Sequence, residues 1–474
     1  MSASGRSGLS SSPSDDATGY QAAVALYDAG RFEEALRLAV ALLDAAPAFV
    51  HALTLAAACS HHLGHSVGEE AYLRRLVALQ PDDTLTCYNL GVLLFRLKRL
   101  SEAQMWCERA LALSPDFAEA HNSLGLLLSD LGRTTGAEAA LRRALALRPG
   151  WPDAEVNLAH LLLSLGRYAE GWARYEARNA AGGSLKLNAR PSIESTLWRG
   201  ETLRGKSLLV WHEQGYGDMI QFGRYLPMLR AMGASRVVLA CPQILHVLFA
   251  SVEGIEIALD TEAAASDARC DYWTPAMSLP HFAGTTVDSI PPAVYLRADP
   301  MRIVHWQPRL PDRRHGRRIG LVWKGTATHV NDRARSLPSL ATLAPLWSVP
   351  GVQFVSVQKG RGEEEANHAP RDQPIVPLGC DIGDFADSAA IVSQLDLLIS
   401  VDTSAAHLAG SLGVPCWVLL PSVETDWRWQ REGTRSPWYP QTTRLFRQAG
   451  SDWSQVVAQV RDACAECVPT GFAG

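Results

Sequence analysis

The 474-residue sequence has little net charge, few lysines and no long hydrophobic run. Its formal net charge is -5 and no block rich in Lys and Arg stands out, so the electrostatic footprint of a general nucleic-acid binder is missing. No window approaches the roughly 18 uninterrupted apolar residues of a membrane-spanning helix. We therefore expect a soluble, cytoplasmic protein with no nucleic-acid partner and no transmembrane segment.

Cysteine is also sparse. The nine Cys residues lie in segments that otherwise look like cores and helices, which favours reduced thiols over a disulfide framework. The pair Cys464 and Cys467 has no second pair to complete a zinc site, and Gly64 interrupts the histidines around His61. No Asp-x-Asp ends an apolar run. We expect no metal and no cofactor.

A 34-residue period fills the first third of the chain. One phase of the period is occupied by Gly30, Gly64, Lys98, Gly132 and Gly166, and another by Pro47, Pro81, Pro115 and Pro149. Small residues recur between these phases, so each unit is predicted to be two amphipathic helices that cross closely, with a reversal at the glycine and a proline starting the next unit. The pattern resembles tetratricopeptide repeats, in five units over about residues 17–180. One unit cannot bury its apolar face alone, so the array should be a solenoid whose concave surface binds a peptide, a protein or another copy.

The rest of the chain alternates short apolar runs with helical stretches, which predicts βαβ units on parallel sheets. The runs are KSLLVWH, SRVVLA, IEIALD, CDYWTP, RIGLVW, VQFVSVQ, LDLLIS and PCWVLL, with helices near 219–232, 242–252, 339–348, 384–394, 403–412 and 452–466. The expected organisation is a disordered leader at 1–16, a repeat array at 17–180, a linker at 181–204, and two Rossmann-like halves at 205–310 and 311–474. Two such halves place a ligand cleft at the carboxyl ends of their strands.

The first strand-end loop is EQGYGD. Gly215 and Gly217 allow a sharp turn and a close approach to a ligand, and Asp218 follows at the first helical turn. Asp218 is either a helix cap or a carboxylate that takes a proton from an acceptor hydroxyl.

Two further strand ends carry groups suited to an anion. After GLVW come Lys324, Thr326, Arg333 and Arg335, which offer positive charge and hydroxyls for phosphate oxygens, although a solvated loop has the same composition. After LLISV a helix is predicted to begin, so its free N–H groups and dipole favour an anion. The candidate residues of this third loop are Asp402, Thr403, Ser404 and His407. His407 shares a helix face with Thr403 and Ser404, and Asp402 would order the turn or touch a ligand hydroxyl.

At these motifs the segment from about 205 to 450 resembles the heptosyltransferase-like GT-B glycosyltransferases of family 9, in the form that bacteria fuse behind tetratricopeptide repeats. The motifs are EQGYGD, GLVWKG with NDRARSLP, SVDTSAAHLAGSLGVPCWVLLP and DWRWQREGTRSPWYP. The resemblance implies a fold of a tetratricopeptide-repeat solenoid followed by an α/β GT-B domain. It implies that Asp218 is the base, that Lys324 binds phosphate, and that Asp402, Thr403 and His407 grip a sugar nucleotide.

The resulting hypothesis is a metal-independent, inverting glycosyltransferase. It would move a sugar from a nucleotide-diphosphate donor to a hydroxyl of a protein or glycan acceptor that the repeats recruit, with the donor as substrate and no cofactor. Gly215, Gly217, Thr326, Ser404 and the two arginines would contribute to donor binding. Trp427, Trp429, Trp438 and Tyr439 are equally consistent with stacking on sugars and with a core. The alternative is a non-catalytic repeat scaffold with a degenerate nucleotide-binding GT-B domain.

Overall fold

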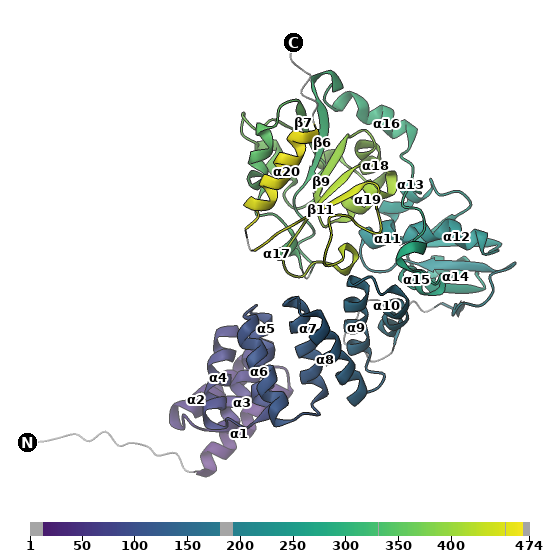
Figure 1. The fold of residues 1–474 in the computed structure, drawn as a ribbon. Coiled ribbons are helices and arrows are strands. Elements are labelled where there is room, and N and C mark those ends of the chain that lie inside the picture. Colours follow the sequence, from purple (N-terminus) through teal and green to yellow (C-terminus); the bar gives the residue numbers. More distant parts are fainter. Residues whose placement is uncertain (1–12, 181–192, 330, 451, 468–474) are drawn as a thin grey trace, which may run out of the picture. The chain divides into compact units, whose positions relative to one another are not determined.

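The computed structural model describes residues 13–180, 193–329, 331–450 and 452–467, and the chain divides into two compact units between Leu158 and Ala159 (Figure 1). Residues 1–12 of the predicted leader and 181–192 of the predicted linker lie outside the described residues. Within the described part, no helix combines the length and the apolar character that crossing a bilayer requires.

The first unit is a series of helices, and from α1 to α8 each packs on the next. They are α1 Pro13–Asp28, α2 Phe32–Ala45, α3 Val50–His62, α4 Ser66–Leu79, α5 Thr84–Arg96, α6 Leu100–Leu113, α7 Ala118–Asp130, α8 Thr134–Leu147 and α9 Pro152–Ser164, which crosses the boundary between the units. The chain reverses after the first helix of each pair through one left-handed residue, and these are the residues at the glycine phase of the period. Lys98 adopts φ 59° there at the energetic cost that glycine avoids. The repeat prolines lie in the turns before the next helix begins, not at its first residue.

Small residues bring the two helices of a pair together. A Cβ added at Gly91 would lie 2.8 Å from the Cys107 sulfur, and one at Gly125 would lie 2.6 Å from a Leu141 side-chain carbon. Both distances are shorter than van der Waals contact, so a larger residue at either position would separate the helices. The close crossing is what lets consecutive pairs bury a continuous core of Ala and Leu side chains.

The second unit contains two parallel sheets. The first sheet has the order β1-β5-β2-β3-β4 and the second the order β11-β10-β9-β6-β7-β8, with every strand pair parallel. The strands are β1 Thr196–Leu197, β2 Ser207–Trp211, β3 Arg236–Cys241, β4 Glu256–Leu259, β5 Tyr272–Pro275, β6 Arg317–Val322, β7 Val352–Ser356, β8 Ile375–Pro377, β9 Leu397–Val401, β10 Cys416–Leu420 and β11 Thr443–Arg447. The predicted fold class, a helical repeat solenoid followed by an α/β region, is confirmed.

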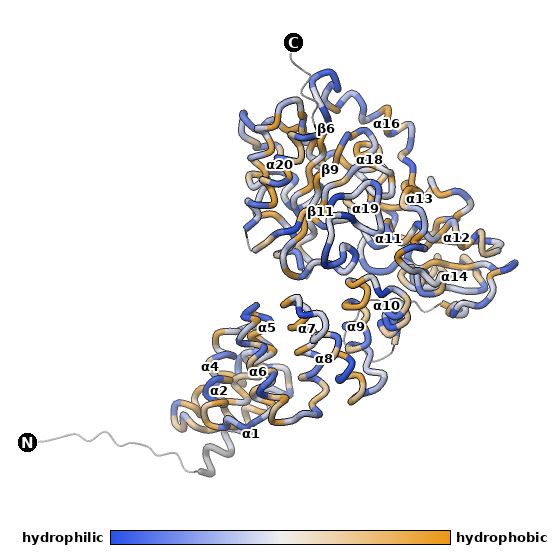
Figure 2. Tube along the Cα trace, in the orientation of Figure 1, coloured by the Kyte–Doolittle hydropathy of each residue, from blue (hydrophilic) through white to orange (hydrophobic). Residues whose placement is uncertain are grey.

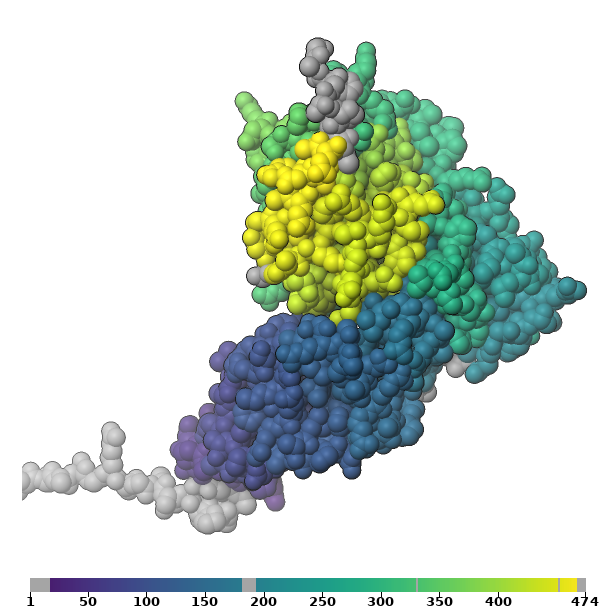
Figure 3. Space-filling model, in the orientation of Figure 1, coloured from purple at the N-terminus to yellow at the C-terminus, as the bar shows by residue number. Residues whose placement is uncertain are grey.

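Helices connect these strands, as parallel pairing requires. Those of the second unit are α10 Tyr168–Tyr175, α11 Tyr216–Phe222, α12 Leu226–Ala231, α13 His246–Phe249, α14 Glu262–Asp267, α15 Leu279–Phe282, α16 Pro300–Trp306, α17 Asp332–Arg335, α18 Phe385–Val392, α19 Ser404–Leu412 and α20 Ser454–Cys467. In Figure 1, α18 and α19 lie on one side of the second sheet and α20 on the other. Hydropathy is high along the central strands β6 and β9 (Figure 2), whereas α20 lies at the surface of the unit (Figure 3).

The structure differs from the predicted elements in several respects. The segment 339–348 is a 3-10 helix, Leu340–Ser348, because Pro345 inside it lacks the N–H that an α-helix needs. The short strands β1 and β8 and the strand β11 were not predicted, and β1 places residues of the predicted linker in the first sheet. Helix α16, assigned to the first half by sequence, packs on α18 of the second, where Arg302 pairs with Asp384.

Helix α10 belongs to the second unit by packing. Trp172 is 1% exposed and its ring centroid lies 5.3 Å from that of Trp427 and 5.9 Å from that of Phe222. Tyr168 stacks on Trp438 at 5.8 Å. The helix that ends the repeat pattern therefore contributes part of the α/β core.

We expect Trp172→Ala to lower the free energy of unfolding of the second unit by roughly 3–5 kcal/mol, because it removes a fully buried indole. Amide hydrogen exchange resolved by peptide should accelerate in the strands of residues 207–241 and 416–447 and stay unchanged in residues 50–130. Leu94→Ala, in the core of the first unit, is the matched control and should give the reverse pattern. If Trp172→Ala accelerated exchange only in the helical repeats, this assignment of α10 would be wrong.

Candidate active site

A cavity of about 660 Å³ lies where the carboxyl ends of strands from both sheets meet in the second unit. The loops after β2, β6, β7 and β9 border it, together with α18 and the loop that follows β10. The sequence-predicted residues that line it are Gly215, Gly217, Asp218, Lys324, Thr326, Arg335, Asp402, Thr403, Ser404 and His407. Arg333 is exposed and does not line it, because the single turn of α17 directs neighbouring side chains to different sides.

The turn at residues 212–218 reverses the chain between β2 and α11. Its left-handed residue is Gln214, with φ 59°, and not either of the predicted glycines. Gly215 is the N-cap of α11. A Cβ added at Gly217 would lie 3.1 Å from His407 and 3.3 Å from the Ser404 Cα, so this glycine lets α11 approach the first turn of α19.

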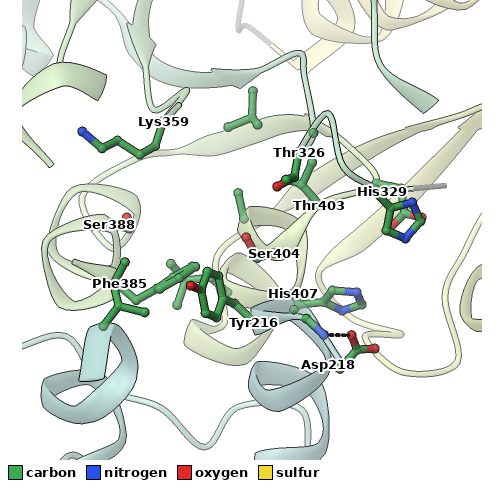
Figure 4. A pocket seen from close by; sticks show the side chains of 18 of the residues that line it. Tyr216, Asp218, Thr326, His329, Lys359, Phe385, Ser388, Thr403, Ser404 and His407 are labelled. Atoms are coloured by element: carbon green, nitrogen blue, oxygen red, sulfur yellow. Dashed lines mark hydrogen bonds between the residues drawn. The ribbon is translucent and has the colours of Figure 1, made fainter. Parts of the chain in front are cut away.

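Asp218 lies in the first turn of α11, where its Oδ2 accepts a 2.8 Å hydrogen bond from the Gly215 N–H. Its Oδ1 pairs with the Arg428 guanidinium. Burial raises the pKa of Asp218 above its ordinary value, while Arg428 and the Gly215 N–H oppose that rise. The Asp218 carboxylate therefore caps the helix and also borders the cavity (Figure 4).

Arg428 is the main residue that the sequence reasoning missed. Its side chain is 6% exposed and lies on the Trp427 ring, 4.3 Å from the ring centroid. Besides Asp218, it donates to both carboxylate oxygens of Asp426 at 2.9 Å and to Gln221 Oε1 at 2.7 Å. Asp218 follows strand β2 of the first sheet, and Asp426 follows strand β10 of the second. This guanidinium therefore links the two halves at the edge of the cavity.

Lys324 does not present a free ammonium to the cavity, because its Nζ pairs with Glu365. The loop that carries it is ordered by Gln358, which is 1% exposed. Gln358 Oε1 accepts 2.9 Å hydrogen bonds from the N–H groups of Trp323 and Lys324, and its amide donates to the Lys324 carbonyl at 3.0 Å.

Arg335 also borders the cavity and has a donor that no described residue uses. Its nearest acidic partner is Asp332, with 3.9 Å between Arg335 Nε and Oδ1, and its buried Nε has no hydrogen-bond partner among the described residues. Gly325 makes room for it, since a Cβ there would lie 2.8 Å from the guanidinium. Thr326 and Thr403 both line the same cavity (Figure 4).

The N-terminus of α19 also faces the cavity. Thr403 is its N-cap and makes no side-chain capping hydrogen bond; its hydroxyl lies 3.1 Å from that of Ser400. Among the described residues, none accepts a hydrogen bond from the Ser404 N–H, so this donor and the helix dipole are available to an anion.

His407 lies one turn into α19 and is 5% exposed. Its ring stacks on Trp429 at 5.1 Å, and its Nδ1 lies 3.0 Å from the Tyr439 hydroxyl. Burial, with a smaller contribution from Arg428, lowers the pKa of His407 to about 3. The imidazole is therefore neutral at physiological pH and can offer an anion a hydrogen bond but no charge.

The pKa values of two neighbouring carboxylates, Asp402 and Asp426, are shifted in opposite directions. Burial and the neighbouring Asp426 raise the pKa of Asp402 to about 6. Burial also acts to raise the pKa of Asp426, but Arg428 and the hydrogen bonds it donates lower it overall. Asp402 is thus a group that can hold or release a proton near neutral pH, whereas Asp426 stays ionised to keep Arg428 in place.

Some of the aromatic residues near the site line the cavity, and others belong to the protein core. Tyr216 and Phe385, with ring centroids 5.4 Å apart, both line the cavity (Figure 4). The four aromatics of the DWRWQ and SPWYP motifs are at most 6% exposed and do not line the cavity, which answers the open alternative in favour of a core. Among the described residues, no cluster of three or more His, Cys, Asp or Glu could hold a metal ion.

We expect Asp402→Asn to raise the free energy of unfolding at about pH 7.5 by roughly 1–3 kcal/mol. The folded-state pKa lies above the unfolded one, so the wild-type carboxyl favours folding below about pH 4 and loses that contribution as pH rises through about 6. Urea unfolding at about pH 4 and 7.5 measures the difference, which should be small at the lower pH.

Asp426→Asn is the matched control and should act in the opposite direction at about pH 7.5, since the pKa of Asp426 is lowered by its partners. Destabilisation by both substitutions at that pH would contradict the assignment of Asp402.

The tetratricopeptide-repeat family model matches residues 20–84, 70–118, 88–154 and 122–184, so the chain carries tetratricopeptide repeats. Protein FlbA of Caulobacter vibrioides is 30% identical over 315 residues, which cover 62% of this chain and 52% of FlbA. The chain thus spans about half the length of this curated relative.

Solved structures with similarity to about a third of this chain include three repeat proteins. A tetratricopeptide-repeat protein of Thermus thermophilus is 31% identical over 36% of this chain and 93% of its own, with a TM-score of 0.30. MamA is 22% identical over 33% of this chain and 91% of its own, with a TM-score of 0.31. YrrB, described as having an unusual peptide-binding site, is 18% identical over 34% of this chain and 84% of its own, with a TM-score of 0.31.

Proposed function

We propose that the second unit is a GT-B glycosyltransferase and that the repeats recruit its acceptor. The observation that carries the proposal is the cavity itself. One side of it offers Arg335 and the N-terminus of α19 to an anion, and another offers the carboxylate of Asp218. A nucleotide-diphosphate leaving group and an acceptor hydroxyl need these two kinds of group at one place.

In the proposed reaction the acceptor hydroxyl gives its proton to Asp218. Its oxygen forms a bond to the anomeric carbon of the donor sugar while the bond from that carbon to the diphosphate oxygen breaks, and the electron pair leaves with the nucleoside diphosphate. Attack opposite the leaving group inverts the anomeric centre. A pKa of Asp218 raised by burial makes it a stronger base than an exposed aspartate.

The leaving diphosphate would be stabilised without a metal. Arg335 supplies charge and a planar fork, and the Ser404 N–H lies at the positive end of the helix dipole. The hydroxyls of Thr326 and Thr403 and the neutral His407 add hydrogen bonds. Lys324 joins them only if a ligand competes with Glu365 for its ammonium.

The repeats support a partner-binding role, and a protein or glycan acceptor is the partner that fits the proposed reaction. The similarity to FlbA covers 62% of this chain, more than the 20–184 span of the repeats, so it includes sequence of the second unit. A scaffold without catalysis is the competing function, and the experiments below separate the two.

We expect the protein to bind a nucleoside diphosphate and Arg335→Met to weaken that binding roughly 10- to 100-fold, the effect of losing a charge-assisted contact. Titration calorimetry with a panel of nucleoside diphosphates and sugar nucleotides measures it. Arg333→Met is the matched control, because that side chain is exposed and does not line the cavity. Equal affinities in the two variants would place the anion elsewhere, and no binding by the wild type would favour the scaffold.

Asp218→Asn should lower kcat for sugar transfer roughly 10²- to 10⁴-fold and leave donor affinity within a few fold, because a general base acts in the chemical step. Rates with the best donor of the panel measure it. The side-chain amide can still accept from Gly215, which keeps the local fold. Unchanged transfer would remove Asp218 as the base.

Removing residues 1–150 leaves α9 and α10 intact and should impair acceptor use while donor binding persists. Removing residues 1–180 should abolish both, because α10 is part of the α/β core. Transfer rates with and without acceptor test this, and a loss of donor binding in the shorter deletion would contradict the division of roles.

A further inference from the structure

The end of the repeat region makes polar contacts with the turn that carries Asp218. Arg178, in the 3-10 turn Glu176–Asn179 directly after α10, is fully buried with its partner Glu213. Its Nε donates to Glu213 Oε1 at 2.7 Å and its Nη2 donates to Oε2 at 3.0 Å. This bidentate, charge-assisted pair fixes the carboxylate in both distance and orientation.

The rest of the network also holds Glu213. Its Oε2 also accepts from the Met277 N–H at 2.9 Å. The Ser278 hydroxyl accepts from Arg178 Nη2 at 2.9 Å and donates to Glu176 at 3.0 Å. A buried ion pair adds little net stability compared with apolar packing. A network with this many hydrogen bonds is therefore better explained by the conformation that it specifies.

Gln214, the next residue, has the strained left-handed conformation of this turn, which costs roughly 1–2 kcal/mol for a residue other than glycine. Its side-chain amide donates a 2.8 Å hydrogen bond to the Tyr175 hydroxyl, at the last residue of α10. The Tyr175 hydroxyl in turn contacts the Met277 sulfur at 3.9 Å. Tyr175 therefore stabilises the conformation that reverses the chain.

Only a few residues of the turn separate these contacts from Asp218. Gln214 lines the cavity and is followed by Gly215, whose N–H donates to Asp218. If Gln214 relaxed to a right-handed conformation, the Gly215 N–H would change direction and Asp218 would lose one of its two fixed partners. A displacement of about 1 Å at a reacting group costs up to a hundredfold in rate.

We propose that Tyr175 and Arg178 are positioning residues for Asp218, so that the last helix of the repeat region is a working part of the α/β site. This inference rests on the proposed transferase function. It assigns to α10 and the turn after it a role beyond recruitment of a partner, because without them the 212–218 turn has neither its buried ion pair nor the partner of its strained residue.

The test uses the full chain and Tyr175→Phe, which removes one hydroxyl and keeps the ring. Tyr168→Phe is the matched control: it removes a buried hydroxyl from the same helix, but its ring stacks on Trp438 and not on the turn. Both variants should melt within a few degrees of the wild type. We expect Tyr175→Phe to lower kcat roughly 10- to 100-fold with an unchanged KM for the donor, and to accelerate amide exchange in residues 213–218.

Arg178→Lys is the second variant, because it keeps the charge and loses the bidentate fork. It should show the same split between kcat and KM, and the same local exchange. Equal behaviour of Tyr175→Phe and Tyr168→Phe in an active enzyme would overturn the inference alone, as would faster exchange of the turn without any loss of kcat. A wild type that transfers sugar from no donor of the panel would instead overturn the proposed function.

Discussion

The buried guanidinium of Arg428 is the interaction on which the arrangement of the cavity depends. It pairs with Asp218, in the helix that follows β2 of the first sheet, and with Asp426, in the loop that follows β10 of the second, so one side chain with three polar partners joins the two halves at the cavity. A buried cation with two carboxylates is stable only while both remain in place. The guanidinium lies over the Trp427 ring at 4.3 Å and near the Phe222 ring at 5.7 Å, and Trp172 packs on both of these aromatic residues.

This constraint explains why the DWRWQ motif contains both charged and aromatic residues. Asp426 orients the arginine, the tryptophans bury it, and the arginine then reaches Asp218, 210 positions earlier in the chain. The same burial keeps His407 neutral, because its pKa is lowered by loss of solvent and by the nearby guanidinium. Charge in this cavity therefore follows from packing as much as from residue type.

The sequence predicted the parts of this arrangement that have a local cause. The 34-residue period identified the left-handed residue within each helix pair of the repeats, Lys98 included, and apolar runs identified the central strands that precede Asp218, Lys324 and Ser404. The parts with a non-local cause were missed or misjudged. Nothing near Lys324 indicates its pairing with Glu365, and the choice between Arg333 and Arg335 depends on the direction of one helical turn. Gln214 carries the strain expected of a glycine because a distant tyrosine stabilises it.

The cations of the cavity consequently fall into two classes. Arg428 and Lys324 have carboxylate partners within hydrogen-bond distance, whereas the buried Nε of Arg335 has no hydrogen-bond acceptor among the described residues and lies 3.9 Å from Asp332 Oδ1. An anionic ligand gains most from the second class, since it displaces no hydrogen bond of that Nε. It would also lie in the same cavity as Asp402, whose pKa already stands at about 6 because of burial and Asp426. Another negative charge would raise that pKa further. Binding of an anion should therefore favour the protonated form of Asp402, which removes a repulsion and supplies a hydrogen-bond donor where the ligand needs one.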